Sequence, residues 1–279
     1  MSARNEGFFP PIKRAFHALS KGFTLLIIAI LCAAFLDSLL FQGVIEYTGA
    51  KNLQDIMSLP AEEKNAVLIQ VVLGYTGVGL IKSILIGPIF AALIVYNGRC
   101  SVTNRPVSLY AGFNFAINRY KRLFLPYLIA QLSIQLGNII VIPGIMFMMQ
   151  YAFVDSIACL EQEKHVISRS VKLTKGRRKS LFFLILPWAI LTQLFGFLAL
   201  YASDSMLKLT AANMLLEGLI FMMYTCFFML YDQRIKQIEE LRAERLAQQK
   251  EQQLDASSME EDETIKETSA TVSQSSEQA

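Results

Sequence analysis

Apolar residues along this chain fall into long blocks that are separated by charged segments. The blocks cover residues 23–45, 66–96, 123–142, 145–160, 180–201 and 213–231. A helix needs about 20 residues to cross the hydrocarbon layer of a bilayer, and helices bond all their backbone polar groups internally. The pattern therefore predicts an all-α, polytopic membrane bundle of about six transmembrane helices.

Two of the blocks differ from a simple span. The second block is longer than one crossing needs, so it could tilt, protrude from the bilayer or bend at Gly87-Pro88, where proline removes a helical hydrogen bond. The fourth block is short, and Ile142-Pro143-Gly144 before it predicts a tight turn. The third and fourth blocks should then form a helical hairpin.

Each odd-numbered block follows a basic segment with an apolar face. The segments cover 12–22, 107–122 and 164–179. In the third, Val166, Ser170 and Thr174 share one face, which predicts a helix lying on the cytoplasmic leaflet. Its basic residues are candidate contacts for anionic lipids: Lys164, Arg169, Lys172, Lys175, Arg177, Arg178 and Lys179. A topology signal without lipid selectivity explains the same pattern, and we prefer it because cytoplasmic loops are generally basic.

The formal net charge of +3 conceals a strongly sided distribution. Lysine and arginine gather before the first block, between the second and third, and between the fourth and fifth. The alternate loops carry only Lys51, Lys64 and Lys208. The positive-inside rule therefore predicts that both termini are cytoplasmic.

The composition changes after the last block. Residues 232–254 are rich in Gln, Glu, Arg and Lys, which predicts a solvated helix that could bind a protein partner. Residues 255–279 have no aromatic residue and many acidic and hydroxyl side chains, which predicts a disordered tail. The expected divisions are a cytoplasmic basic amphipathic leader (1–22), a membrane domain (23–231), a charged helix (232–254) and an acidic tail (255–279).

Ionisable residues inside the apolar blocks are the first candidates for function, because placing a charge in lipid costs about 2.5–3.5 kcal/mol. The candidates are Asp37, Lys82 and Asp155. Asp37 and Lys82 lie equally far from the cytoplasmic ends of adjacent antiparallel blocks, which predicts an ion pair. A proton or ion relay is the functional interpretation. A structural pair, or a lysine that reaches the outer headgroups, is the preferred alternative.

Gln131, Gln135 and Asn138 share one face of the third block. Across the expected hairpin, Gln131 lies level with Asp155. These side chains predict a polar seam between the third and fourth blocks. The seam could hold the two helices together or line a narrow cavity, and we prefer the first interpretation because one seam does not enclose a path.

Signatures of enzymes and of metal sites are weak or absent in the sequence. The four cysteines are scattered, His17 and His165 are the only histidines, and no phosphate-binding or hydrolase motif occurs. We therefore expect no cofactor, no metal, no nucleic-acid partner and no enzymatic activity. The preferred function is a scaffold or envelope-supporting role, and the alternative is a transporter or channel component for a small solute, an ion or a lipid.

Four short motifs carry a resemblance to a known family. They are LCAAF at 31–35, MSLPAEE at 57–63, VIPGI at 141–145 and SRSVKLT at 168–174. Together they resemble the YciC-like family of bacterial inner-membrane proteins and, more loosely, the membrane domains of some glycerophosphodiester phosphodiesterases. The resemblance covers roughly residues 13–231 and implies a six-helix protein of the bacterial inner membrane. It supplies no catalytic residue.

Overall fold

The computed structural model describes residues 9–49, 53–138, 142–175, 177–201 and 205–276. Within these ranges all regular structure is helical, which confirms the predicted class. Clustering divides the chain into two units, Met1–Tyr231 and Asp232–Ala279. The helices are α1 Phe9–Lys21, α2 Phe23–Tyr47, α3 Leu53–Met57, α4 Ala61–Leu85, α5 Gly87–Val102, α6 Leu109–Asn138, α7 Ile142–Tyr151, α8 Val154–Leu160, α9 Val166–Thr174, α10 Arg178–Tyr201 and α11 Met206–Ser276.

Three helical segments of the described chain are long and apolar enough to cross a membrane: Phe23–Tyr47, Ile142–Leu160 and Met206–Lys250. They contain the first, fourth and sixth predicted blocks. Large apolar side chains on other helices, such as Leu73 on α4 and Ile190 on α10, are also exposed. Such a surface suits lipid better than water, as expected of a membrane protein.

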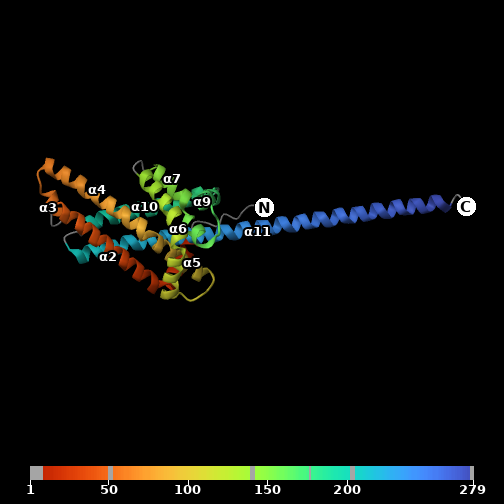
Figure 1. Ribbon diagram of the computed structural model, residues 1–279, viewed down its shortest axis with the longest axis horizontal. Coiled ribbons are helices and arrows are strands. Elements are labelled where there is room, and N and C mark those ends of the chain that lie inside the picture. The colour runs from red at the N-terminus through yellow and green to blue at the C-terminus, as the bar shows by residue number, and fades with distance from the viewer. Residues whose placement is uncertain (1–8, 50–52, 139–141, 176, 202–204, 277–279) are drawn as a thin grey trace. The chain divides into compact units, whose positions relative to one another are not determined.

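The first unit is held together near its N-terminal end by small apolar clusters. Helices α2 and α4 pack on each other, and the short helix α3 lies between them in sequence (Figure 1). Val44 of α2, Ile56 of α3 and Val71 of α4 form one cluster. A second cluster joins α2 to Leu209 of α11. These contacts fix α2 against α4 and α11.

Two helices of the first unit are interrupted. Of the alternatives expected for the second block, the structure shows the interruption at Gly87-Pro88, since α4 ends at Leu85 and α5 begins at Gly87. Pro88 lies in the first turn of α5, where its missing N–H leaves no intrahelical bond unmade. The fourth block is also divided, into α7 and α8, which the sequence did not predict. At this turn the ring of Phe153 is buried against that of Tyr231, with centroids 5.9 Å apart.

The turn predicted at Ile142-Pro143-Gly144 is wrong, because these residues form the first turn of α7. Proline is tolerated in the first turn of a helix, so Pro143 does not oppose this arrangement. A Cβ on Gly137 of α6 would lie 2.8 Å from the backbone nitrogen of Gly144. The absence of a side chain on Gly137 therefore permits the close approach of α6 and α7.

The three basic segments all form helices, but they pack on the protein in different ways. Segment 12–22 lies largely in α1, a separate helix that contacts α5. Segment 107–122 continues without interruption into the third block as α6. Helix α9 buries Val166, Ser170 and Thr174 within the protein, where α9 contacts α6, α7 and α8. Ser170 Oγ donates a hydrogen bond of 2.7 Å to the carbonyl oxygen of Gln150, a specific contact that lipid could not provide.

Helix α11 continues beyond the sixth block through 232–254, as predicted, and then through the predicted disordered tail to Ser276. The disorder expected for this tail therefore differs from the structure. No glycine or proline follows Gly218 in the sequence. Extending an existing helix avoids the cost of nucleation, so a polar segment without helix breakers can follow on from an apolar one.

Candidate functional site

Three charged side chains from three helices meet inside the first unit. Lys82, in the last turn of α4, places its Nζ 2.5 Å from Asp37 Oδ2 of α2 and 3.0 Å from Glu217 Oε1 of α11. The side chains of Lys82, Asp37 and Glu217 are 12%, 12% and 10% exposed, so solvent screens their interaction weakly. The structure brings Asp37 and Lys82 together, as their equal depth predicts. We call these three residues the charged triad.

A polar contact next to the charged triad fixes how α2 and α11 face each other. Ser38 Oγ donates to the Ala34 carbonyl oxygen at 2.8 Å and accepts from Asn213 Nδ2 at 3.0 Å. Asn213 and Glu217 are four residues apart, so they lie on one face of α11, towards Ser38 and Asp37. Adjacent residues of α2, Asp37 and Ser38, therefore face one side of α11. Ser38 bonds to Asn213, and Asp37 shares Lys82 with Glu217.

Glu217 was not among the site residues predicted from the sequence, although its position in an apolar block could have identified it. It lies inside the predicted sixth block, where an ionisable residue qualifies by the same rule as Asp37 and Lys82. The pairing itself could not be read from the sequence. Lys82 of α4 contacts Glu217 of α11 across 135 residues of sequence, and no local pattern specifies such a contact.

A cavity of about 820 Å³ lies beside the charged triad. Residues of α4, α5, α6, α7, α10 and α11 line it, including Lys82 and Glu217 but not Asp37. Much of the remaining wall is apolar, as at Ile134, Met148 and Ile220. Small-molecule sites commonly have volumes of about 300–1,000 Å³ and apolar walls with a few polar groups, and this cavity has both properties.

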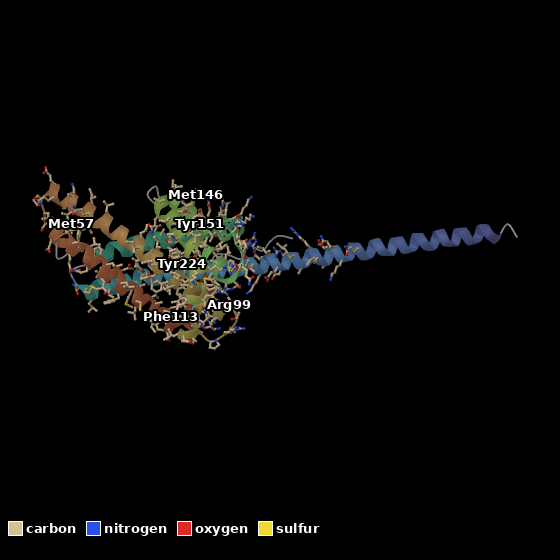
Figure 2. The ribbon with its side chains drawn as sticks, viewed as in Figure 1. Met57, Arg99, Phe113, Met146, Tyr151 and Tyr224 are labelled. Atoms are coloured by element: carbon tan, nitrogen blue, oxygen red, sulfur yellow. The ribbon has the colours of Figure 1, made fainter. Side chains whose placement is uncertain are left out.

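A second polar contact lies on the cavity wall. Gln131 Nε2 of α6 donates a hydrogen bond of 3.1 Å to the hydroxyl of Tyr224 on α11, a half-buried residue that is labelled in Figure 2. One turn before Gln131, Tyr127 lies close to the bend between α4 and α5. A Cβ on Gly87 would be 2.3 Å from the Tyr127 hydroxyl oxygen, so the ring needs a glycine at this bend.

The polar seam predicted between the third and fourth blocks is not formed as expected. Gln131 bonds to α11, and in the described part of the chain no hydrogen bond joins it to Asp155. Gln135 lines the cavity, and the side chain of Asn138 lies outside the described residues. Asp155 lies in the first turn of α8.

The basic residues of segment 164–179 have different surroundings. Arg169 is used inside the protein, where its Nε donates to Glu161 Oε2 at 3.1 Å. Glu161 Oε1 accepts from the Tyr231 hydroxyl at 2.8 Å, and the Glu161 carbonyl oxygen accepts from Arg122. We call these four residues the Glu161 cluster. Arg177 is half-buried, and the other candidate lipid contacts are exposed: Lys164, Lys172, Lys175, Arg178 and Lys179.

The described residues contain no group of three or more His, Cys, Asp or Glu side chains arranged to hold a metal ion. The four cysteines are free, and Cys100, Cys159 and Cys226 are buried.

Comparisons of the chain with protein-family models, with curated proteins and with solved structures found no match.

Proposed function

We propose that this chain is a membrane protein that binds a small amphipathic molecule inside its helical bundle, as a component of a transporter or channel. The observation that carries the proposal is the cavity of about 820 Å³, which joins an apolar wall to a charged end. An amphipathic ligand uses both surfaces. The bend between α4 and α5 beside the cavity supports the proposal, because transporters often bind substrates where membrane helices are interrupted.

The proposal changes the order of the two functions expected from the sequence. From the sequence, a scaffold was preferred because the predicted polar seam between the third and fourth blocks does not by itself enclose a path for a solute. The cavity instead draws its wall from six helices, and its two charged lining residues come from helices distant in the sequence. Buried charge in an apolar layer is costly and commonly marks a ligand or ion pathway, so binding now explains more of the molecule than scaffolding does. A non-enzymatic role remains part of the proposal.

The proposed topology has six spans with both termini in the cytoplasm of a bacterium. Helices α4, α6 and α10 have 25, 30 and 24 residues, and a crossing needs about 20. The sided lysines and arginines support the orientation, and their exposed members would contact anionic lipids. The four family-like motifs support membership of the YciC-like inner-membrane proteins. A reporter fused after Gln248 should be active only in the cytoplasm, and periplasmic phosphatase activity would contradict this topology.

The binding function is tested by filling the cavity. Ala189 of α10 lines it, whereas Leu194 of the same helix is exposed and does not. Ala189→Phe should remove small molecules that copurify with the wild type, and the matched Leu194→Phe variant should retain them. Native mass spectrometry of the purified proteins measures both. The same bound molecules in all three proteins, at equal membrane yield, would refute the proposal.

One feature of the second unit favours a scaffold role, in which the protein binds a protein partner. Residues 239–250 of α11 are all exposed and mostly charged or amide-bearing, as a surface for a protein partner would be. Truncation after Tyr231 should then abolish crosslinks to a partner in native membranes and leave copurifying small molecules in place. Crosslinks that survive the truncation would contradict a docking role for this unit.

A further inference from the structure

We infer that the cavity selects organic cations, in which an ammonium-type charge is carried on an apolar body. The inference rests on the proposed binding function and adds the charge of the ligand to it. Three observations support it: the charge balance of the triad, the position of Glu217 on the cavity wall, and the aromatic residues around the cavity.

The charged triad places two carboxyl groups against one ammonium group. Asp37 and Glu217 each bring one carboxylate, and Lys82 is the one cation that pairs with them in the described parts of the chain. With all three groups ionised, the triad carries one excess negative charge. An uncompensated charge in a weakly screened site is costly, and either a proton shared by the two carboxyl groups or a cationic partner removes that cost. A cationic ligand is such a partner.

The placement of the triad sets which sign of charge the cavity accepts. Glu217 lines the cavity, and Asp37 approaches Lys82 from α2, away from the lining. The Lys82 ammonium is thus already held by two carboxylates. An anionic head group would have to compete with both for the same nitrogen. A cation instead meets Glu217, a carboxylate that shares its single lysine with Asp37.

The cavity wall also contains groups that attract an organic cation. Phe90, Tyr127, Phe221 and Tyr224 all line it, and the rings of Phe90 and Phe221 have centroids 5.8 Å apart. The face of an aromatic ring attracts an ammonium ion, more strongly when water is excluded. Aliphatic residues on the rest of the wall suit the apolar body. A small inorganic cation would use neither the rings nor the aliphatic wall.

The test compares two ions that have nearly the same size and shape but opposite charge, tetraphenylphosphonium and tetraphenylborate. Equilibrium dialysis measures saturable binding of each to the full-length protein in neutral maltoside micelles, with protein-free micelles subtracted. We expect tetraphenylphosphonium to bind at least about tenfold more tightly, equivalent to about 1.4 kcal/mol. The comparison needs no change in the triad, so it remains decisive even where a triad variant fails to insert.

Two pairs of variants locate the selectivity. Glu217→Gln should reduce tetraphenylphosphonium affinity at least about tenfold, while Glu62→Gln, an exposed carboxylate on α4, should leave it unchanged. Ala189→Phe should abolish binding and Leu194→Phe should not. Equal binding of the two ions, abolished by Ala189→Phe, would overturn cation selectivity and leave the proposed binding function standing. Absence of saturable binding of both ions would overturn the inference and count against the function as well.

The ammonium group could belong to a free organic cation or to a lipid head group, and one further measurement distinguishes them. Phosphatidylethanolamine added to the micelles will displace tetraphenylphosphonium when the cavity takes a lipid ammonium. Displacement by this lipid supports the inference with a membrane lipid as the source. Retention of the probe, together with displacement by a soluble alkylammonium ion, supports it with a free cation. Retention against both competitors would overturn it.

Discussion

The charged triad and the Glu161 cluster both join helices that are distant in the sequence, but they differ in how their carboxylates are paired. In the Glu161 cluster, one carboxylate has two guanidinium neighbours, and each of its oxygens accepts one hydrogen bond, from Arg169 and from Tyr231. In the triad, two carboxylates share one lysine. The triad is also more shielded, since its side chains are at most 12% exposed, against 29% for Arg169 and 22% for Glu161.

This difference separates a structural contact from a candidate binding site. Both carboxylate oxygens of Glu161 have hydrogen-bond donors within the cluster, and these bonds join α6, α9 and the end of the first unit. In the triad, two carboxylates share one lysine at the wall of a cavity. A folded protein that retains an unbalanced charge in an apolar setting commonly uses it for function.

The largest effect is expected from Lys82→Met. The substitution leaves Asp37 and Glu217 without their shared cation, and removing one member of a buried ion pair commonly costs about 3–5 kcal/mol. Unfolding in bicelles measures the loss of stability. Lys64→Met, on the same helix, is the control and should cost far less. Equal losses of stability for both variants would show that Lys82 contributes no more to stability than an ordinary lysine of α4.

A second variant sharpens this result. Adding Glu217→Gln to Lys82→Met removes one of the two stranded carboxylates, so part of the lost stability should return. Residues that interact directly couple by about 0.5–3 kcal/mol in a double-mutant cycle, whereas distant sites add independently. Coupling below about 0.5 kcal/mol would show that the two side chains do not act together.

An intermediate effect is expected from Glu161→Ala. Hydrogen bonds to charged groups contribute roughly 1.5–3 kcal/mol, and the loss should be at the lower end because the cluster is partly exposed. Thermal unfolding of the purified protein measures it. Glu163→Ala, at an exposed position two residues further, should have little effect. Tetraphenylphosphonium affinity should not change in either variant, and a change with Glu161→Ala would link the cluster to the cavity.

The smallest effect is expected from matched removal of one hydroxyl in each region. Ser38→Ala removes the acceptor for Asn213 beside the triad, and such bonds between membrane helices average about 0.6 kcal/mol. Ser170→Ala removes the bond to Gln150 and should cost about 1 kcal/mol. Only Ser38→Ala should also alter ligand affinity, since it loosens the helix that carries Glu217. Equal effects on affinity would contradict the separation of the two regions.

Much of the helical layout could be predicted from the sequence because apolar length is a local property. The first and last blocks, the bend at Gly87 and the helical continuation beyond Tyr231 all correspond to helices or interruptions in the structure. The division of the fourth block could not be predicted in this way. No glycine or proline marks it, and its turn coincides with burial of Phe153 against α11.

The sequence by itself determined which residues are costly in an apolar block, and it placed Asp37 and Lys82 at the same depth. Depth follows from counting along single helices, because each residue advances a helix by a fixed rise. Only the tertiary structure decided that Glu217 completes the triad, that Gln131 bonds to Tyr224, and that Arg169 turns inward to Glu161. These partners lie on different helices, so their meeting depends on helix rotation and packing, which no spacing within one segment specifies.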